Sequence, residues 1–143
     1  DLCWAEPTLL ERVIDNLYSN AVHYGAESGT IWIRSRLAGD KIQIDVANTG
    51  AGIPSAEQAM IFEPFYQGSL QRKGAVKGSG LGLSIARDCI RRMQGDLHLV
   101  TVFLTVKWWI IKRPLARPSG LMMTKKPLRM GFIGCARWTV PIA

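Results

Sequence analysis

The sequence predicts an α+β fold, a two-layer α/β sandwich in which helices cover one face of a mixed, mostly antiparallel β-sheet. Three observations support this prediction. Apolar residues recur at helical spacing over two stretches, which end at Gly25 and at Gly95. Between them, two alternating apolar segments flank a turn signal at residues 38–40, the pattern of a β-hairpin. A further strand begins at Leu97, and no internal repeat is present.

The first helix is expected to begin at Pro7, because proline is favoured in the first turn of a helix. Its apolar face is made of Leu9, Leu10, Val13, Ile14, Leu17, Tyr18 and Ala21. A short strand over residues 2–4 precedes it. The helix is therefore predicted to pack one apolar face against the sheet.

The rest of the domain follows from similar patterns. The hairpin should bury one face, because its apolar residues alternate with polar ones: Ile31, Ile33, Ile42, Ile44 and Val46. A helical turn is expected before Phe62, then a polar loop over residues 67–80 and a second helix from Gly80–Leu81. The stretch 101–106 is a candidate for one more strand.

Length and cysteine content limit the class of protein. The chain has 143 residues, enough for one domain with a core, and no apolar run reaches the roughly 18 residues of a membrane span. Its cysteines, Cys3, Cys89 and Cys135, are widely spaced and odd in number, so we expect free thiols in a reducing cytoplasm. Because it starts at Asp1 without a signal peptide, we expect a fragment of a longer protein.

Charge divides the chain into two zones. Residues 1–100 contain ten Lys and Arg and eleven Asp and Glu, whereas residues 101–143 contain eight Lys and Arg and no carboxylate. We therefore expect a domain over 1–100 and a basic tail over 101–143. Two interpretations of the tail stay open, a basic appendage or the poorly folding product of a shifted reading frame. The lack of Asp and Glu favours the second.

Three polar side chains form a ridge on the first helix. Asn16, Asn20 and His23 are spaced so that they lie along one side, at the edge of the apolar face. Amide oxygens are hard ligands that suit Mg²⁺, so the two asparagines are candidates to hold a metal ion against phosphates. A solvated polar face with ordinary asparagines is the alternative.

Two glycine-rich loops are candidates for nucleotide binding. Residues 48–54 follow a strand, where Gly50 and Gly52 let the backbone approach a flat ligand and Asn48 can pair with an adenine edge. A simple turn is the alternative. Residues 77–83 run into the second helix, whose first N–H groups suit a phosphate. Neither a Rossmann fingerprint in a βαβ unit nor a Walker loop is present.

Together these segments resemble sensor histidine kinases. Residues 15–24, DNLYSNAVHY, resemble the N box of that family, and residues 48–54, 61–66 and 78–83 resemble its G1, F and G2 boxes in the same order and spacing. The resemblance covers residues 4–100. Residues 71–92 are particularly similar to the QseE/GlrK type within the family.

The resemblance implies the Bergerat (GHKL) ATP-binding fold with Mg²⁺ and ATP as ligands. It implies that Asn16 and Asn20 form the catalytic and metal centre, with His23 by the phosphates and Tyr24 by the adenine. The adenine pocket would consist of Asn48, Gly50, Gly52 and Ile53. Phe62 and Phe65 would seat a lid over residues 67–80. The triphosphate would be wrapped by Lys77, Gly78, Gly80, Leu81 and Gly82, with Arg72 and Lys73 also available.

The implied reaction is transfer of the γ-phosphate of ATP to a histidine on a dimerisation hairpin, which we expect to be absent from this chain. A response regulator would be the further partner, and the setting would be the cytoplasmic part of an inner-membrane sensor. ATP-hydrolysing relatives of the gyrase, Hsp90 and MutL types are one alternative. They carry an acidic residue where this chain has Asn16, which accepts no proton at neutral pH. A nucleic-acid-binding tail is the other alternative, and its scattered charges argue against it.

One residue departs from the family pattern. The G1 box usually opens with Asp, whereas this chain has Asn48. A carboxamide oxygen still accepts a hydrogen bond from the adenine amino group, but a neutral acceptor forms a weaker bond. We expect a loss of about 1 kcal/mol in ATP affinity.

Overall fold

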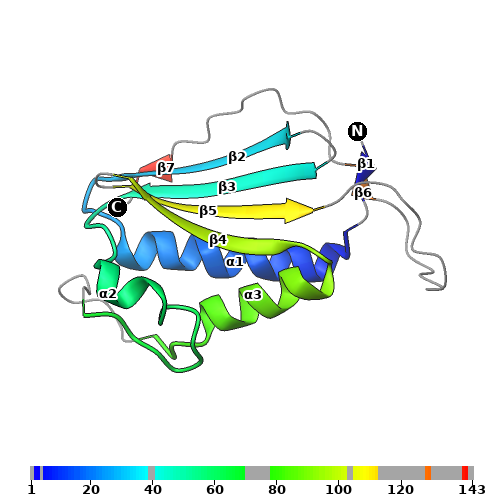
Figure 1. Cartoon of the computed structure of the whole chain (residues 1–143). Helices are drawn as coiled ribbons and strands as arrows, with labels where there is room; N and C mark the ends of the chain where they lie inside the picture. Colours follow the sequence, from blue (N-terminus) through cyan, green and yellow to red (C-terminus); the bar gives the residue numbers. More distant parts are fainter. Residues whose placement is uncertain are drawn as a thin grey trace.

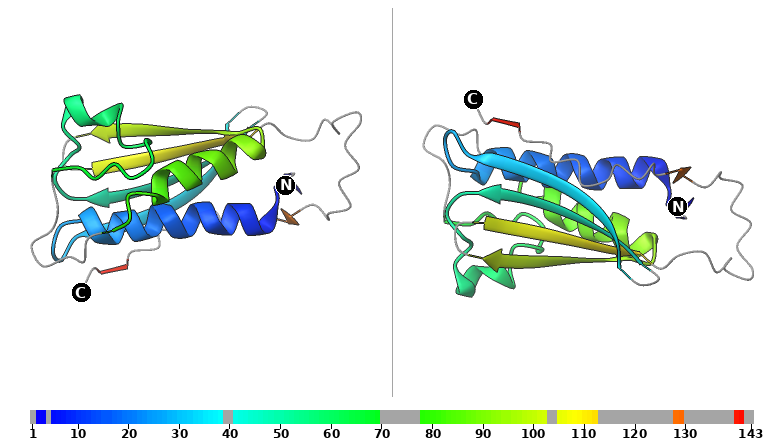
Figure 2. Two further views of the ribbon diagram at one scale, coloured as in Figure 1. Left: turned by 90° about the horizontal axis from the view of Figure 1, so that it is seen from below. Right: turned by 90° about the horizontal axis from the view of Figure 1, so that it is seen from above.

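The computed structural model describes residues 2–3, 5–38, 41–69, 78–102, 105–112, 128–129 and 140–141. Its larger β-sheet forms one layer, and the two long helices, α1 (Pro7–Tyr24) and α3 (Gly82–Arg92), lie together against one face of it (Figure 1). The views from below and from above show the helices in front of the sheet and behind it, respectively (Figure 2). The predicted α+β sandwich is confirmed.

Helix α1 follows the sequence pattern closely. Pro7 occupies its first turn, and the helix buries Val13, Leu17 and Ala21, which are spaced four residues apart on one face. It ends at Tyr24, directly before Gly25. This helix therefore contributes one continuous apolar stripe to the core, with Asn16 and Asn20 beside that stripe.

The larger sheet has the strand order β4-β5-β3-β2-β7, and its described strand pairs are all antiparallel. The strands are β2 (Thr30–Ala38), β3 (Lys41–Thr49), β4 (Asp96–Val102), β5 (Thr105–Lys112) and β7 (Val140–Pro141). The predicted hairpin is β2 and β3, in register with Ile33 opposite Val46. The expected strand over residues 101–106 is instead shared between the end of β4 and the start of β5, which pair with each other. Two short strands, β1 (Leu2–Cys3) and β6 (Leu128–Arg129), form a separate pair.

The main core lies between the helices and the sheet. Its buried members come from α1, β3, α3, the residue that follows α3 and the start of β4: Val13, Leu17, Ile44, Val46, Ala86, Cys89, Ile90, Met93 and Leu97. Packed interiors of this kind provide most of the favourable free energy of folding. They also hold α1 and α3 side by side, so the first residues of α3 lie next to the polar ridge of α1.

Strand β3 differs from the expectation of a single buried face. All residues from Gln43 to Asn48 are buried, including the polar Gln43 and Asp45 on the face opposite Ile44 and Val46. Gln43 Nε2 donates to Asp45 Oδ1 at 2.6 Å, and an Arg36 guanidinium nitrogen donates to Gln43 Oε1 at 3.0 Å. Because β3 lies between β2 and β5, both of its edges are paired. Pairing between the polar groups offsets their loss of water.

Cys89 is buried on α3 as a free thiol, as predicted for that residue, whereas Cys135 lies outside the described residues. None of the helices that the structure describes combines the length and the apolar composition needed to cross a bilayer.

Candidate functional site

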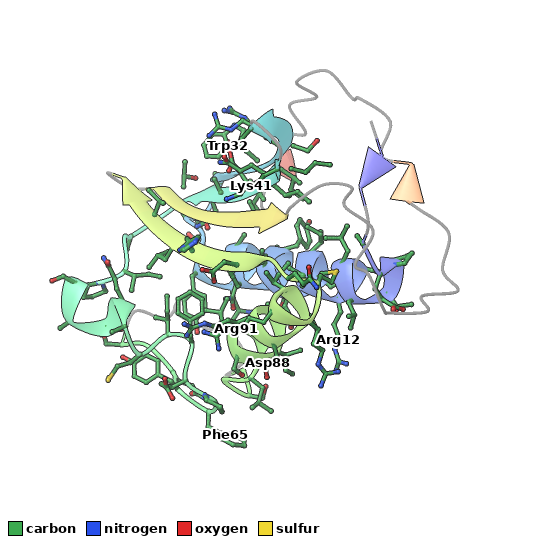
Figure 3. The ribbon with its side chains drawn as sticks, turned by 45° about the vertical axis from the view of Figure 1, so that its right-hand side comes forward. Arg12, Trp32, Lys41, Phe65, Asp88 and Arg91 are labelled. Atoms are coloured by element: carbon green, nitrogen blue, oxygen red, sulfur yellow. The ribbon has the colours of Figure 1, made fainter. Side chains whose placement is uncertain are left out.

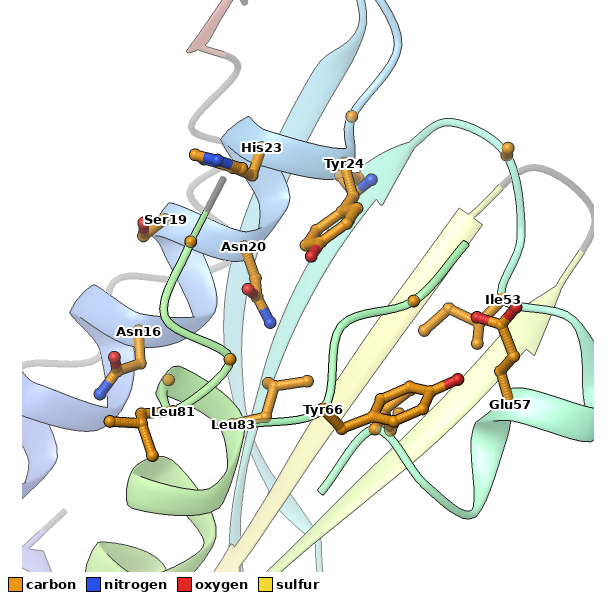
Figure 4. Close-up of a pocket in the computed structure, with 18 of the residues that line it drawn as sticks. Asn16, Ser19, Asn20, His23, Tyr24, Ile53, Glu57, Tyr66, Leu81 and Leu83 are labelled. Carbon is orange, nitrogen blue, oxygen red and sulfur yellow. The ribbon is translucent and has the colours of Figure 1, made fainter. Parts of the chain in front are cut away.

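A cavity of about 730 Å³ opens between α1, the short helix α2 (Ser55–Gln58), residues 48–54 and the start of α3 (Figure 4). This volume falls in the range of small-molecule and cofactor sites. Eleven of the residues singled out from the sequence line it: Asn16, Asn20, His23, Tyr24, Asn48, Gly52, Ile53, Gly78, Gly80, Leu81 and Gly82. The fold therefore brings three separate sequence motifs to one cavity.

The polar ridge of α1 forms one wall. Asn16 Nδ2 donates to the carbonyl oxygen of Arg12 at 2.8 Å, which orients the amide group. Its Oδ1 atom lies on the side of α3, where a Cβ atom on Gly82 would be 3.2 Å away. About two turns further along α1, the rings of His23 and Tyr24 lie 6.0 Å apart between centroids, tilted by 55°. Burial raises the pKa of the Tyr24 hydroxyl above its usual value.

Strand β3 provides a second wall of the cavity, which includes Asn48. The residue is only 3% exposed, and its Nδ2 atom donates to the carbonyl oxygen of Thr49 at 3.2 Å. The Oδ1 atom is therefore the acceptor that this amide offers to a ligand. The loop after β3 is held by Gln58 Nε2, which donates to the carbonyl oxygen of Ile53 at 3.0 Å.

Gly50 belongs to this loop but does not line the cavity. Gly50 is buried and has φ +156°, and a Cβ atom there would lie 2.8 Å from the carbonyl oxygen of Tyr24. The carbonyl oxygen of Thr49 accepts a hydrogen bond from Ala26 N at 2.8 Å. Gly50 thus lets the loop approach the end of α1, and its effect on the cavity is indirect.

The third wall is the backbone that opens α3. Gly80 has φ +72°, and a Cβ atom there would lie 2.7 Å from Tyr66 O and from Phe65 C. Its carbonyl oxygen accepts a hydrogen bond from Phe65 N at 2.9 Å. Leu81 N donates to Ser79 Oγ at 3.4 Å just before α3, and the N-cap residue Leu81 makes no side-chain cap hydrogen bond. The first N–H groups of this helix therefore remain for water or an anion.

The two phenylalanines that were expected to seat a lid, Phe62 and Phe65, lie in different environments. Phe62 packs against the core, with the guanidinium of Arg87 4.8 Å from its ring centroid, and it does not line the cavity. Phe65 is 73% exposed and projects from the edge of the molecule (Figure 3). Phe65 has φ +65°, and its backbone packs against Gly80, so its side chain is directed outward. Lys77, Arg72 and Lys73 lie outside the described residues.

Sequence reasoning missed several residues of the cavity, among them Ser19, Glu27, Glu57, Tyr66, Leu83 and Ile85. Glu57 accepts hydrogen bonds from Ser69 N at 3.2 Å and from the Ser69 hydroxyl. Burial, together with the charge and hydrogen bonding of Glu57, raises the pKa of Tyr66. Tyr66 belongs to the F-box stretch, so the resemblance to that motif could have identified it as a candidate cavity residue. No local pattern marks Glu57, because its helix has only four residues.

The donor set bears on which metal ion the cavity can hold. Among the residues that the structure describes, no group of three or more His, Cys, Asp or Glu side chains is arranged as a metal site. Asn16 and Asn20, whose side chains each carry an amide oxygen, line the cavity instead. Such hard, neutral oxygens suit Mg²⁺ bound together with phosphates, which supply the remaining ligands.

Comparisons with known proteins agree with this geometry. Residues 5–119 match the family model described as histidine kinase-, DNA gyrase B-, and HSP90-like ATPase. The sensor histidine kinase GlrK of Escherichia coli K12 is 76% identical over 98 residues, which are 68% of this chain and 21% of that protein. The chain thus spans about a fifth of the length of this relative. The similarity to the QseE/GlrK type is confirmed.

Solved structures show the same fold. The catalytic domain of the histidine kinase ThkA in a nucleotide-free form superposes with a TM-score of 0.66 at 30% identity, covering 77% of this chain and 69% of that one. Full-length ShkA in complex with AMPPNP has a TM-score of 0.61 at 25% identity, covering 77% and 23%. These relatives are histidine kinases, so the comparisons do not favour the alternatives of an ATP-hydrolysing domain or a nucleic-acid-binding module.

Proposed function

Because this chain belongs to the family of histidine kinase-, DNA gyrase B- and HSP90-like ATPases, we propose that it binds Mg·ATP in the cavity and donates the γ-phosphoryl group to a protein histidine. One observation carries the proposal. Asn16 and Asn20 of α1 line a cavity of about 730 Å³ together with the uncapped, glycine-rich start of α3, whose first residue, Gly82, lies beside Asn16 Oδ1. This pairing of amide oxygens with free backbone N–H groups suits a metal-bound triphosphate.

The adenine would lie at the end of the cavity formed by residues 48–54. Asn48 Oδ1 accepts from the exocyclic amino group, since its Nδ2 atom is engaged with Thr49. Ile53 and the ring of Tyr24 provide apolar surface for the base, and Gly52 allows a close backbone approach. Gly50 and Phe62 act indirectly. Gly50 fixes the loop after β3, and Phe62 fixes the segment 61–66 to the core.

The triphosphate would lie at the opposite end. Asn16 and Asn20 hold Mg²⁺ and phosphate oxygens, and His23 stands beside them on the same ridge. Gly78, Gly80, Leu81 and Gly82 surround the phosphates with backbone N–H groups, and Lys77 adds a cation. A bound Mg²⁺ neutralises part of the phosphate charge and so favours phosphoryl transfer.

Asn16 also bears on the type of reaction. An asparagine amide has no basic site at neutral pH, so it does not activate a water molecule for attack on ATP. The γ-phosphate is therefore not hydrolysed by this domain and is available for transfer to a nucleophile that a partner supplies. That partner would be a helical hairpin carrying the acceptor histidine, and a response regulator would receive the group next. The domain would act in the cytoplasmic part of an inner-membrane sensor, and it includes β5 (Thr105–Lys112), which pairs with β3 and β4 in the sheet.

Calorimetry and γ-labelled ATP test the proposal. We expect the 143-residue chain to bind Mg·ATP without labelling itself, and to label the acceptor hairpin of the full-length kinase supplied in trans. A base-stable, acid-labile phosphohistidine on the chain itself would contradict the assignment of roles. Binding of DNA that falls steeply with salt, with no ATP binding, would favour the nucleic-acid alternative instead.

A further inference from the structure

Glu57 connects α2 with the segment 66–69 at the rim of the cavity. Its Oε2 atom accepts from Ser69 N at 3.2 Å, and its Oε1 atom accepts from the Ser69 hydroxyl. A Cβ atom on Gly68 would lie 2.8 Å from Oε2, so the backbone of the segment lies directly against the carboxylate. Figure 4 shows Glu57 and Tyr66 together at the end of the cavity that Ile53 forms, away from Asn16.

The same segment is joined to the loop that opens α3. Gln67 Nε2 donates to the carbonyl oxygen of Gly78 at 2.7 Å, and Phe65 N donates to that of Gly80 at 2.9 Å. The close contact between Gly80 and Tyr66 leaves no room for a side chain at position 80. A restraint on residues 66–69 therefore also restrains Gly78 and Gly80, the part of the cavity proposed to meet the phosphates.

The chemistry of Glu57 favours an indirect role. Ser69 engages both carboxylate oxygens, which uses about half of the roughly four acceptor sites of a carboxylate. A negative charge in a cavity for triphosphate is also unfavourable for the ligand, because like charges repel. Glu57 is therefore expected to affect ATP binding through its hydrogen bonds to the protein and not through direct contact with the nucleotide.

We propose that Glu57 is a positioning residue for nucleotide binding, which holds Gly78 and Gly80 in place by fixing residues 66–69 to α2. The proposal rests on the proposed function of the cavity as an ATP site. The carboxylate reduces the freedom of the backbone around the phosphates before ATP binds, so ATP binding costs less conformational entropy.

Calorimetric titration of Glu57→Ala with Mg·ATP tests this proposal. Loss of the hydrogen bonds to Ser69 should weaken ATP binding about three- to tenfold, the range of one or two partly exposed hydrogen bonds. A pure charge effect has the opposite sign, since removal of a negative charge should strengthen binding of a triphosphate. Adenosine, which lacks phosphates, should lose much less affinity than ATP.

Two further variants complete the test. Ser69→Ala should weaken ATP binding in the same direction, and the double variant should bind no more weakly than Glu57→Ala alone, because both changes break the same connection. Glu63→Gln, which removes the same charge from an exposed neighbour, should leave the affinity unchanged. Additive effects of Glu57 and Ser69, or an equal loss for ATP and adenosine in folded variants, would overturn the positioning role. Failure of the unmodified chain to bind ATP would instead overturn the proposed function, and this inference with it.

Discussion

Asn16 of α1 lies directly against Gly82, the first residue of α3. A Cβ atom on Gly82 would be 3.2 Å from Asn16 Oδ1, and the Asn16 amide is oriented by its bond to the Arg12 carbonyl. An amide oxygen of α1 therefore lies next to the first residue of α3 in the wall of the cavity. A single added methyl group at Gly82 is therefore expected to move the Asn16 amide oxygen.

Gly82→Ala should separate binding from stability. Alanine is favoured over glycine in a helix by about 1 kcal/mol, which offsets the crowding, so the free energy of unfolding should change by less than about 1 kcal/mol. The added methyl group displaces Asn16 Oδ1, so ATP should bind about three- to tenfold more weakly. In an Asn16→Ala background the same change should have little further effect on binding. Calorimetry and urea unfolding provide the two measurements.

Gly80→Ala should destabilise the folded chain by roughly 1–3 kcal/mol, because Gly80 has φ +72° and its Cβ would collide with the backbone of residues 65 and 66. Gly78 serves as the control position, because a Cβ atom there would have no other atom within 4 Å. Gly78→Ala should therefore change the unfolding free energy by no more than about 0.5 kcal/mol. Equal losses in urea unfolding without nucleotide would contradict this account of Gly80.

Asn20→Asp should nearly abolish ATP binding although the two side chains are almost the same size. The carboxylate keeps a metal ligand but loses the amide donor and repels phosphate oxygens, which costs several kcal/mol in a partly buried site. Calorimetry measures the loss, and a melting temperature close to that of the unmodified chain serves as the control. Unchanged affinity in a folded variant would remove Asn20 from the site.

Asn48→Asp should strengthen ATP binding by about 1 kcal/mol, since a charged acceptor forms a stronger bond to the adenine amino group. The same change should lower stability without nucleotide. Asn48 is 3% exposed, and a carboxylate would lose the bond to the Thr49 carbonyl and be buried beside it. Calorimetry and thermal unfolding should thus move in opposite directions. A variant that binds ATP more weakly would show that Asn48 does not face the base.

Tyr66→Phe should reduce the loss of stability at alkaline pH. Burial and the Glu57 carboxylate raise the pKa of Tyr66 in the folded state above the usual value near 10. As the pH rises through about 10, the unfolded chain loses this proton first, so stability falls as the pH increases further. The phenylalanine variant lacks this proton, so its unfolding free energy should fall less between about pH 9 and pH 11. Identical pH profiles in urea unfolding would contradict the raised pKa.

Much of the fold could be predicted because helical and alternating patterns are local. The spacing of Val13, Leu17 and Ala21 predicted α1 and its buried face, and both were confirmed. The end of α3 was harder to predict. Gly95 was expected to stop the helix, but Gln94 takes the left-handed conformation with φ +59°, and Gly95 N then bonds to the Ile90 carbonyl. Residues other than glycine adopt this conformation at modest cost, so composition alone does not identify the position.

The sequence by itself determined the family, the fold class and the residues on the ridge of α1, because helical periodicity and ordered motifs are properties of the chain alone. Only the tertiary structure decided which motif residues meet. It set Phe62 in the core and Phe65 in solvent, buried both faces of β3, and brought Glu57 to Ser69 at the rim of the cavity. These outcomes depend on contacts between segments far apart in the chain, whose packing has no counterpart in local spacing.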